Sequence, residues 1–190
     1  MKQVYLVLSQ TGTYVSRIIR FFTKDRYNHV SVSLSPELDK MFSFARKGRY
    51  NALNAGFVLE RLDSGMFARF SHGDCCVLEL SVTEADYRLL KERLEEFLQE
   101  PPRYKFNVLG LLAMMFNIGV SRNNHYFCSQ FVAYLLYGEK GHGKLPEKTR
   151  PVEFLSLPNA KTIYEGKIAA AMNTLRQNRL KKPKGLTVTA

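Results

Sequence analysis

The sequence predicts an α+β fold in which a mostly antiparallel sheet packs against helices. Short β-branched and aromatic runs, separated by turn residues, fill the chain as far as Val82 and indicate about five strands. Two segments with helical spacing of apolar residues follow, over 83–97 and 129–136. A hydrophobic content of 45% in 190 residues is enough for one packed core, and the chain is too short for two full-sized domains.

The first part of the chain alternates between strand and helix patterns. Gln3–Ser9 is a β-branched and aromatic run that ends at a turn, which is typical of a first strand. Residues 14–23 space apolar side chains as in an amphipathic helix, with arginines opposite. His29–Leu34 alternates with period two, so we expect a strand packed on one face, with its histidine and serines on the other. After a turn, Lys40–Ala45 returns as its antiparallel partner.

Two further strands and a helix come next. Gly56–Arg61 and Cys75–Val82 are strand candidates, the second preceded by a turn. Thr83 then has the position of an N-cap, with Asp86 at the capping-box position. The apolar stripe of this helix consists of Tyr87, Leu90, Leu94 and Phe97. The pair Pro101-Pro102 is expected to end it.

The remaining chain has weaker patterns. Residues 104–117 form a second, less regular helical region, and the last clear helix covers 129–136. Residues 138–151 have the composition of a loop. We expect short mixed structure over 152–168 and a solvated basic segment over 176–184. The predicted organisation is therefore one domain over residues 1–170 and a basic C-terminal tail over residues 171–190.

Charge and cysteine content bear on partners and compartment. The net charge of +11 and a pI near 9.7 favour anionic partners, and peripheral contact with a membrane is compatible with this charge. Three cysteines, two of them adjacent, do not fit a disulfide framework and favour a reducing compartment, so we expect a cytoplasmic protein. The N-terminus lacks the pattern of a signal peptide, and no apolar run approaches the roughly 20 residues of a membrane span. Nothing in the sequence specifies an oligomeric state.

Cys128 lies where a polar loop changes to the helix pattern of 129–136, in the stretch YFCSQFVAYLLY. The N–H groups and the dipole at the start of a helix stabilise a thiolate, which is one way in which a cysteine becomes a nucleophile. An imidazole held on a rigid strand can take the proton, and His29, the first residue of HVSVSL, has that position. A cysteine can equally be a small buried apolar residue, so the local contexts of both residues matter.

Those contexts, YNHVSV around His29 and YFCSQFV around Cys128, resemble the circularly permuted papain-like cysteine hydrolases, the NlpC-related, YiiX-like group. In ordinary papain-like enzymes the cysteine helix precedes the histidine strand, whereas His29 precedes Cys128 here, as it does in the permuted group. The opening segment SRIIRFFTKDRYNHVSV, the stretch from Tyr104 and the later Pro151 also match that group's layout, so the resemblance covers residues 3 to 165. It implies a permuted papain-like (NlpC-type) fold.

The resemblance also implies roles for individual residues. Cys128 is the expected nucleophile and His29 the general base and acid. The family places a third polar residue on the neighbouring strand to orient the imidazole, and the matching position is Ser43, which offers no charge and is otherwise a small residue on a strand face. Tyr104 matches a tyrosine that faces the oxyanion, or it is a packed aromatic. Ser31 stands where the family has a glycine after His-Val.

Together these features predict a thiol hydrolase or acyltransferase that cleaves an amide or ester through an acyl-enzyme, without a cofactor or metal. Its substrate would be a peptide, a lipid or another acyl compound, and the charge favours an anionic one. The alternative is a catalytically silent papain-like fold that binds an anionic peptide, lipid or nucleic acid.

Other readings are weaker. A zinc site from His72, Cys75, Cys76 and His125 lacks a second close-spaced pair of ligands, and the two adjacent cysteines are expected to point to opposite faces of a strand. A nucleic-acid partner is disfavoured because no recognition motif accompanies the basic tail. No glycine-rich phosphate loop precedes a helix.

Overall fold

One large mixed sheet organises the molecule. The computed structural model describes residues 1–10, 12, 23–47, 54–141 and 143–181. Within these residues the strand order is β7-β6-β4-β3-β2-β1-β5-β8, and neighbouring strands are antiparallel except β6 and β7, which are parallel. The strands are β1 (Lys2–Ser9), β2 (His29–Ser33), β3 (Met41–Arg46), β4 (Ala55–Glu60), β5 (Asp74–Val82), β6 (Lys105–Phe106), β7 (His125–Tyr126) and β8 (Ala160–Lys167). The predicted α+β class is confirmed, as are the five predicted strands, which are β1 to β5.

The prediction of about five strands was too low, because the described chain contains eight. Two of the added strands, β6 and β7, have only two residues each, which is too short for any periodicity. The third, β8, was predicted as short mixed structure. It is an edge strand beside β5 and is mostly exposed, so its sequence AKTIYEGK carries little apolar signal.

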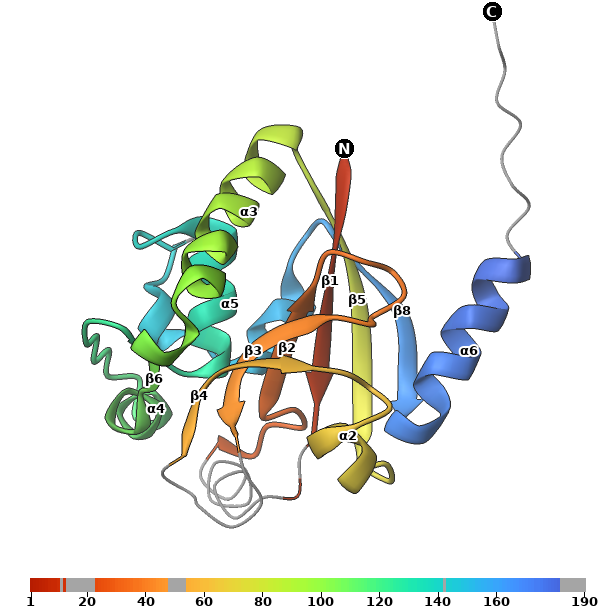
Figure 1. Cartoon of the computed structure of the whole chain (residues 1–190), viewed down its shortest axis with the longest axis horizontal. Helices are drawn as coiled ribbons and strands as arrows, with labels where there is room; N and C mark the ends of the chain where they lie inside the picture. The colour runs from red at the N-terminus through yellow and green to blue at the C-terminus, as the bar shows by residue number, and fades with distance from the viewer. Residues whose placement is uncertain (11, 13–22, 48–53, 142, 182–190) are drawn as a thin grey trace, which may run out of the picture.

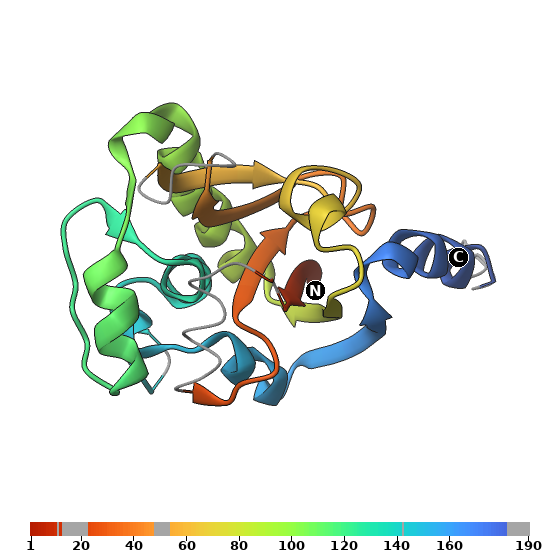
Figure 2. The same ribbon diagram turned by 90° about the horizontal axis from the view of Figure 1, so that it is seen from below.

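Helices cover both faces of the sheet (Figure 1). The helices are α2 (Gly65–Arg69), α3 (Glu84–Gln99), α4 (Val108–Met115), α5 (Cys128–Tyr137) and α6 (Ile168–Lys181), with 3₁₀ turns η1 (Pro101–Arg103), η2 (Pro146–Lys148) and η3 (Pro151–Ser156). Helices α3 and α5 share one core with the sheet, and α2 and α6 share a second core with its opposite face. Seen from below, α6 stands at the side of the molecule away from α4 (Figure 2).

The central strands are buried on both faces. In β1, alternate residues Val4, Leu6 and Leu8 contact the core under α3 and α5, while Tyr5 and Val7 contact the core under α2 and α6. This explains why β1 is apolar throughout rather than alternating. Strand β2 was expected to pack on one face, but all five of its residues are buried, including the face that carries its histidine and serines. That face therefore lies inside the protein.

The helix predictions have different outcomes. Thr83 caps α3 as expected, because its side chain accepts a hydrogen bond from the Asp86 backbone N–H at 3.1 Å. The region 104–117 contains a shorter helix than predicted, α4, because Asn107 caps it and the preceding residues join the sheet as β6. The helix predicted over 14–23 lies, except for Thr23, outside the described residues.

The predicted boundary between domain and tail falls inside α6. This helix begins at Ile168 and continues to Lys181, and its residues Ala171 and Leu175 are buried in the second core. The packed domain thus extends to Leu175, and the basic composition of the segment had hidden the apolar positions that face the sheet. Beyond Leu175, residues Arg176, Gln177, Asn178 and Leu180 are exposed, as expected for the solvated basic segment. Residues 182–190 of the predicted tail lie outside the described residues.

Candidate functional site

Cys128 is the first residue of α5. Phe127 precedes it as the N-cap, and the Phe127 backbone N–H donates to the side-chain oxygen of Gln130 at 3.4 Å. The following turns of α5 are anchored in the main core by Phe131 and Leu135, which are fully buried. The position predicted for Cys128 at a helix start is therefore confirmed, and its side chain is held by a helix whose inner face cannot easily shift.

His29 begins β2 at the end of the sheet where β1 ends, because it pairs with Ser9, the last residue of β1. Its ring is buried, and it lies close enough to the Cys128 side chain for that side chain to raise the pKa of the imidazole. The Nε2 atom lies 3.0 Å from Oε2 of Glu60 and 3.3 Å from the Ser31 hydroxyl. The structure thus brings together the two residues that the sequence paired.

Glu60 is the functional residue that sequence reasoning missed. It is the last residue of β4, and only 9% of it is exposed. Its Oε2 atom accepts a 2.5 Å hydrogen bond from the Ser31 hydroxyl as well as contacting His29. Glu60 pairs with Met41 on β3, so its side chain reaches His29 across a neighbouring strand. The available signal was a carboxylate that closes the otherwise apolar run GFVLE, since a buried acid needs a partner.

The charge state of His29 follows from these contacts. Burial by itself lowers the pKa of the imidazole, because it disfavours the charged ring. The negative charge of Glu60, hydrogen bonds to Cys128 and Glu60, and the charge of a Cys128 thiolate act in the opposite direction and raise the pKa of His29 to about 10. At neutral pH the His29 ring is therefore an imidazolium.

Ser43 does not orient the His29 ring, contrary to the role that the resemblance implied. It is fully buried on β3, and its hydroxyl donates to the backbone carbonyl of Val30 at 2.7 Å. The alternative reading, a small residue on a strand face, describes it better. The orienting position is occupied by Glu60, one strand further along the sheet, which is a charged partner rather than a neutral one.

Tyr104 belongs to an aromatic cluster, as the alternative reading of this residue had it. Its ring lies 4.2 Å from that of Phe97, and its hydroxyl donates to the Glu96 carbonyl at 3.4 Å. This placement directs the phenol toward the C-terminal part of α3, so the implied role at the oxyanion is not supported.

The other two cysteines are separate from this site. Cys75 is buried in the core under α2 and α6, and Cys76 in the core under α3 and α5, which confirms that they point to opposite faces of β5. Burial raises the pKa of Cys75 to about 12. Across the part of the chain that the structure describes, no three His, Cys, Asp or Glu side chains form a group that could hold a metal ion.

A cavity of about 340 Å³ adjoins the Glu60 side of the site. Besides Glu60, its wall includes Phe67 of α2, whose ring centroid is 6.3 Å from that of His29. Three cations, Arg46, Lys47 and Arg61, also line it. Arg61 is paired with Asp63 at 2.8 Å, and Glu60 is itself acidic, so the wall keeps a smaller net positive charge, which would favour a negatively charged group close to the His29 ring.

No protein-family model and no curated protein matches the sequence. Among the described helices, none has both the length and the apolar character that a membrane crossing requires.

Proposed function

We propose that this protein is a cysteine-dependent hydrolase or acyltransferase with a permuted papain-like fold, which acts on an amide or ester through an acyl-enzyme on Cys128. The observation that carries the proposal is the buried chain of contacts from Cys128 through His29 to Glu60. A nucleophile at a helix start, a base beside it and a carboxylate that orients the base together make up the arrangement of an activated thiol.

Each residue has a distinct part in the proposed reaction. The Cys128 thiolate attacks the carbonyl carbon, and a C–S bond forms while the carbonyl oxygen becomes an oxyanion near the backbone N–H groups at the start of α5. The His29 imidazolium then donates its proton to the leaving amine or alcohol as the C–N or C–O bond breaks. Neutral His29 next removes a proton from water, or from another acceptor, which attacks the thioester and releases Cys128. Glu60 holds the ring and stabilises its charge throughout.

The order of the elements supports the permuted form of the fold. The strand that carries the histidine, β2, comes early in the chain, and the helix that carries the cysteine, α5, comes late. Ser31 stands where the resembling group has a glycine. Its hydroxyl donates a hydrogen bond to Glu60, so this difference is compatible with the proposed site. The cavity lined by Arg46, Lys47 and Arg61 favours an anionic substrate. The three free thiols fit a reducing compartment, and we propose the cytoplasm.

A generic activated ester tests the proposal without knowledge of the substrate. With p-nitrophenyl acetate, we expect a burst of p-nitrophenol and a mass increase of one acetyl group on the peptide that contains Cys128. Cys128→Ser should abolish both signals. His29→Ala should slow acetylation by about 10²-fold or more, because it removes the imidazolium that stabilises the thiolate and acts as the proton donor.

The double variant Cys75→Ser/Cys76→Ser is the matched control, because it removes the other two thiols and leaves the site intact. Acetylation of wild type that is independent of His29 would contradict the proposal. It would favour the second reading, a catalytically silent papain-like fold that binds an anionic peptide, lipid or nucleic acid.

A further inference from the structure

Helix α4 presents apolar side chains to solvent. Leu109 is 59% exposed and Phe116 is 66% exposed, and these two lie one helical turn on either side of Leu112. The full set, which we call the α4 patch, is Val108, Leu109, Leu112, Phe116 and Ile118. Soluble proteins rarely expose such residues contiguously unless the surface binds something.

The α4 patch sits on a well-supported helix rather than on a frayed one. The inner residues Leu111 and Met114 are buried against Phe127. Asn107 caps the helix by accepting from the Gly110 N–H at 2.9 Å, and its amide donates to the Val120 carbonyl at 2.9 Å. The outer side chains are therefore held outward by the packing of the inner ones.

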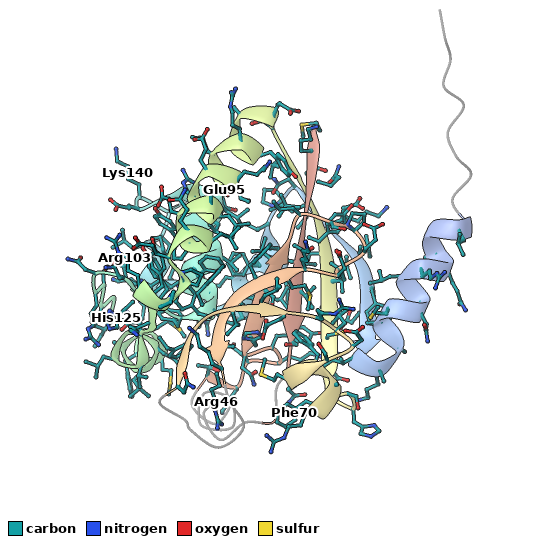
Figure 3. The ribbon with its side chains drawn as sticks, in the orientation of Figure 1. Arg46, Phe70, Glu95, Arg103, His125 and Lys140 are labelled. Carbon is teal, nitrogen blue, oxygen red and sulfur yellow. The ribbon has the colours of Figure 1, made fainter. Side chains whose placement is uncertain are left out.

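The charged residues of the segment that contains the patch are all basic, and two acidic residues from outside the segment lie beside it: Glu100 pairs with Arg103 at 3.4 Å, and Glu147 lies next to Gly119. Residues 101–138 contain no aspartate or glutamate. Three exposed cations, Arg103, Lys105 and Arg122, flank the helix in the sequence on both sides, and the backbone pairing of Lys105 with His125 brings the two flanks together. Figure 3 shows Arg103 and His125 on the side of the molecule where α4 lies. An apolar surface whose border has a net positive charge fits a bilayer surface, in which apolar acyl chains lie beneath anionic headgroups.

We propose that the α4 patch docks this protein onto the surface of an anionic lipid bilayer. Eight residues are far too few to cross a membrane, so α4 would lie in the interface, with its leucines and Phe116 among the acyl chains and the border cations at the headgroups. A second copy of the chain fits less well, because a symmetric contact through this patch would oppose two cationic borders, and each copy carries a net charge of +11.

Docking in this way also orients the site. Phe127 packs beneath α4 and is followed directly by Cys128, and Asn107 bonds to Gln130 in the first turn of α5 at 3.4 Å. The start of α5 is thus fixed to the helix that would meet the lipid. The docking proposal itself does not rest on the proposed function, and its test requires no catalysis.

Co-sedimentation of the full chain with vesicles tests the proposal. We expect binding to phosphatidylcholine vesicles that contain phosphatidylglycerol, weaker binding to pure phosphatidylcholine, and a decrease with added salt. Leu109→Ser/Phe116→Ser should reduce binding at least roughly tenfold, since it removes apolar groups that enter the bilayer. Leu89→Ser/Leu98→Ser on α3 is the matched control, because these leucines are 45% and 41% exposed and the change leaves the net charge unaltered. The control should bind as wild type does.

A single introduced tryptophan tests docking independently of whether the serine variant folds. The chain contains no tryptophan of its own, so the emission comes from the introduced side chain alone. Phe116→Trp should show a blue-shifted emission with anionic vesicles and quenching by brominated acyl chains, whereas Leu89→Trp should show neither. Equal binding by the patch variant and its control would overturn the proposal, as would the absence of binding by wild type. A dimer in light scattering that Phe116→Ser converts to a monomer would assign the patch to a second copy instead.

Discussion

Replacing Glu60 by glutamine should lower the pKa of His29. The substitution keeps the size of the side chain and a polar group beside Nε2 and Ser31, and it removes only the negative charge. Burial lowers the pKa of the ring, so it is the anionic partners and the hydrogen bonds to them that hold the value at about 10. Without the carboxylate, the effect of burial is opposed mainly by Cys128.

The size of the effect follows from the geometry. Two unit charges 3.0 Å apart, the separation of Nε2 and Oε2, attract by about 5 kcal/mol at an effective dielectric constant of about 20. A rise in pKa from 6.5 to about 10 corresponds to a free energy of the same order, at about 1.4 kcal/mol per pKa unit. Part of the Coulomb attraction is spent on desolvation, so we expect Glu60→Gln to lower the pKa of His29 by about 1 to 3 pKa units.

Nuclear magnetic resonance titration of the four histidine side chains measures this value directly, with the His29 signal assigned by its loss in His29→Ala. Ser43→Ala is the matched control, since its hydroxyl bonds to the Val30 carbonyl, and it should leave the pKa of His29 unchanged. A His29 pKa that stays near 10 in Glu60→Gln would refute the reasoning. If Ser43→Ala and Glu60→Gln both left the pKa of His29 unchanged, neither residue would control the charge of the ring.

The pH dependence of the unfolding free energy should show the same effect of Glu60 on the pKa of His29. Because the pKa of His29 is raised on folding, its charged form stabilises the native state fully below pH about 6.5, and this contribution disappears as the pH rises through about 10. The difference in unfolding free energy between wild type and Glu60→Gln should therefore be largest below pH about 6.5, decrease as the pH rises from there to about 10, and be lost above that. Denaturant unfolding of wild type and Glu60→Gln, below pH about 6.5 and above pH about 10, checks this.

Three further outcomes are expected. Peptide-mapped alkylation at pH 7 should modify Cys128 much faster than Cys75, which is fully buried, and equal rates would contradict a selective thiolate. Leu175→Ala should destabilise the protein by about 2 to 5 kcal/mol in denaturant unfolding, whereas Met172→Ala on the exposed side of α6 should cost less than about 1 kcal/mol, and equal costs would mean that α6 is not packed. Gly138→Ala should cost about 1 to 3 kcal/mol, because the backbone φ there is +73°, and a neutral result in thermal unfolding would contradict that conformation.

Strands β1 to β5 and helices α3 and α5 were predictable because each has its own periodicity. Strand β2 and helix α5 carry regular apolar patterns, and the pairing of His29 with Cys128 was predicted from where each begins together with the resemblance of their local contexts to the permuted papain-like hydrolases. The two-residue strands and the exposed edge strand β8 gave no comparable signal, since they depend on partners distant in sequence.

Glu60 could not be assigned from the sequence for a similar reason. Its role depends on the sheet order, which places β4 two strands from β2, and on a side chain long enough to cross β3. The resemblance pointed to the adjacent strand and therefore to Ser43. In α6, basic residues concealed the spacing of Ala171 and Leu175, because a charged helix and a solvated tail have the same composition.

The position of β1 in the middle of the sheet affects how the protein folds. Both of its partners, β2 and β5, are made later than β1, and the pairing with β5 joins segments that are far apart in the sequence. Such long-range pairings slow folding, because the loop must close before the contacts form. During synthesis, β1 leaves the ribosome first and remains without β5 until Val82 has emerged, and the helix that covers it follows later still. A nascent chain therefore exposes the apolar strand β1 well before the helix that carries Cys128 has been made.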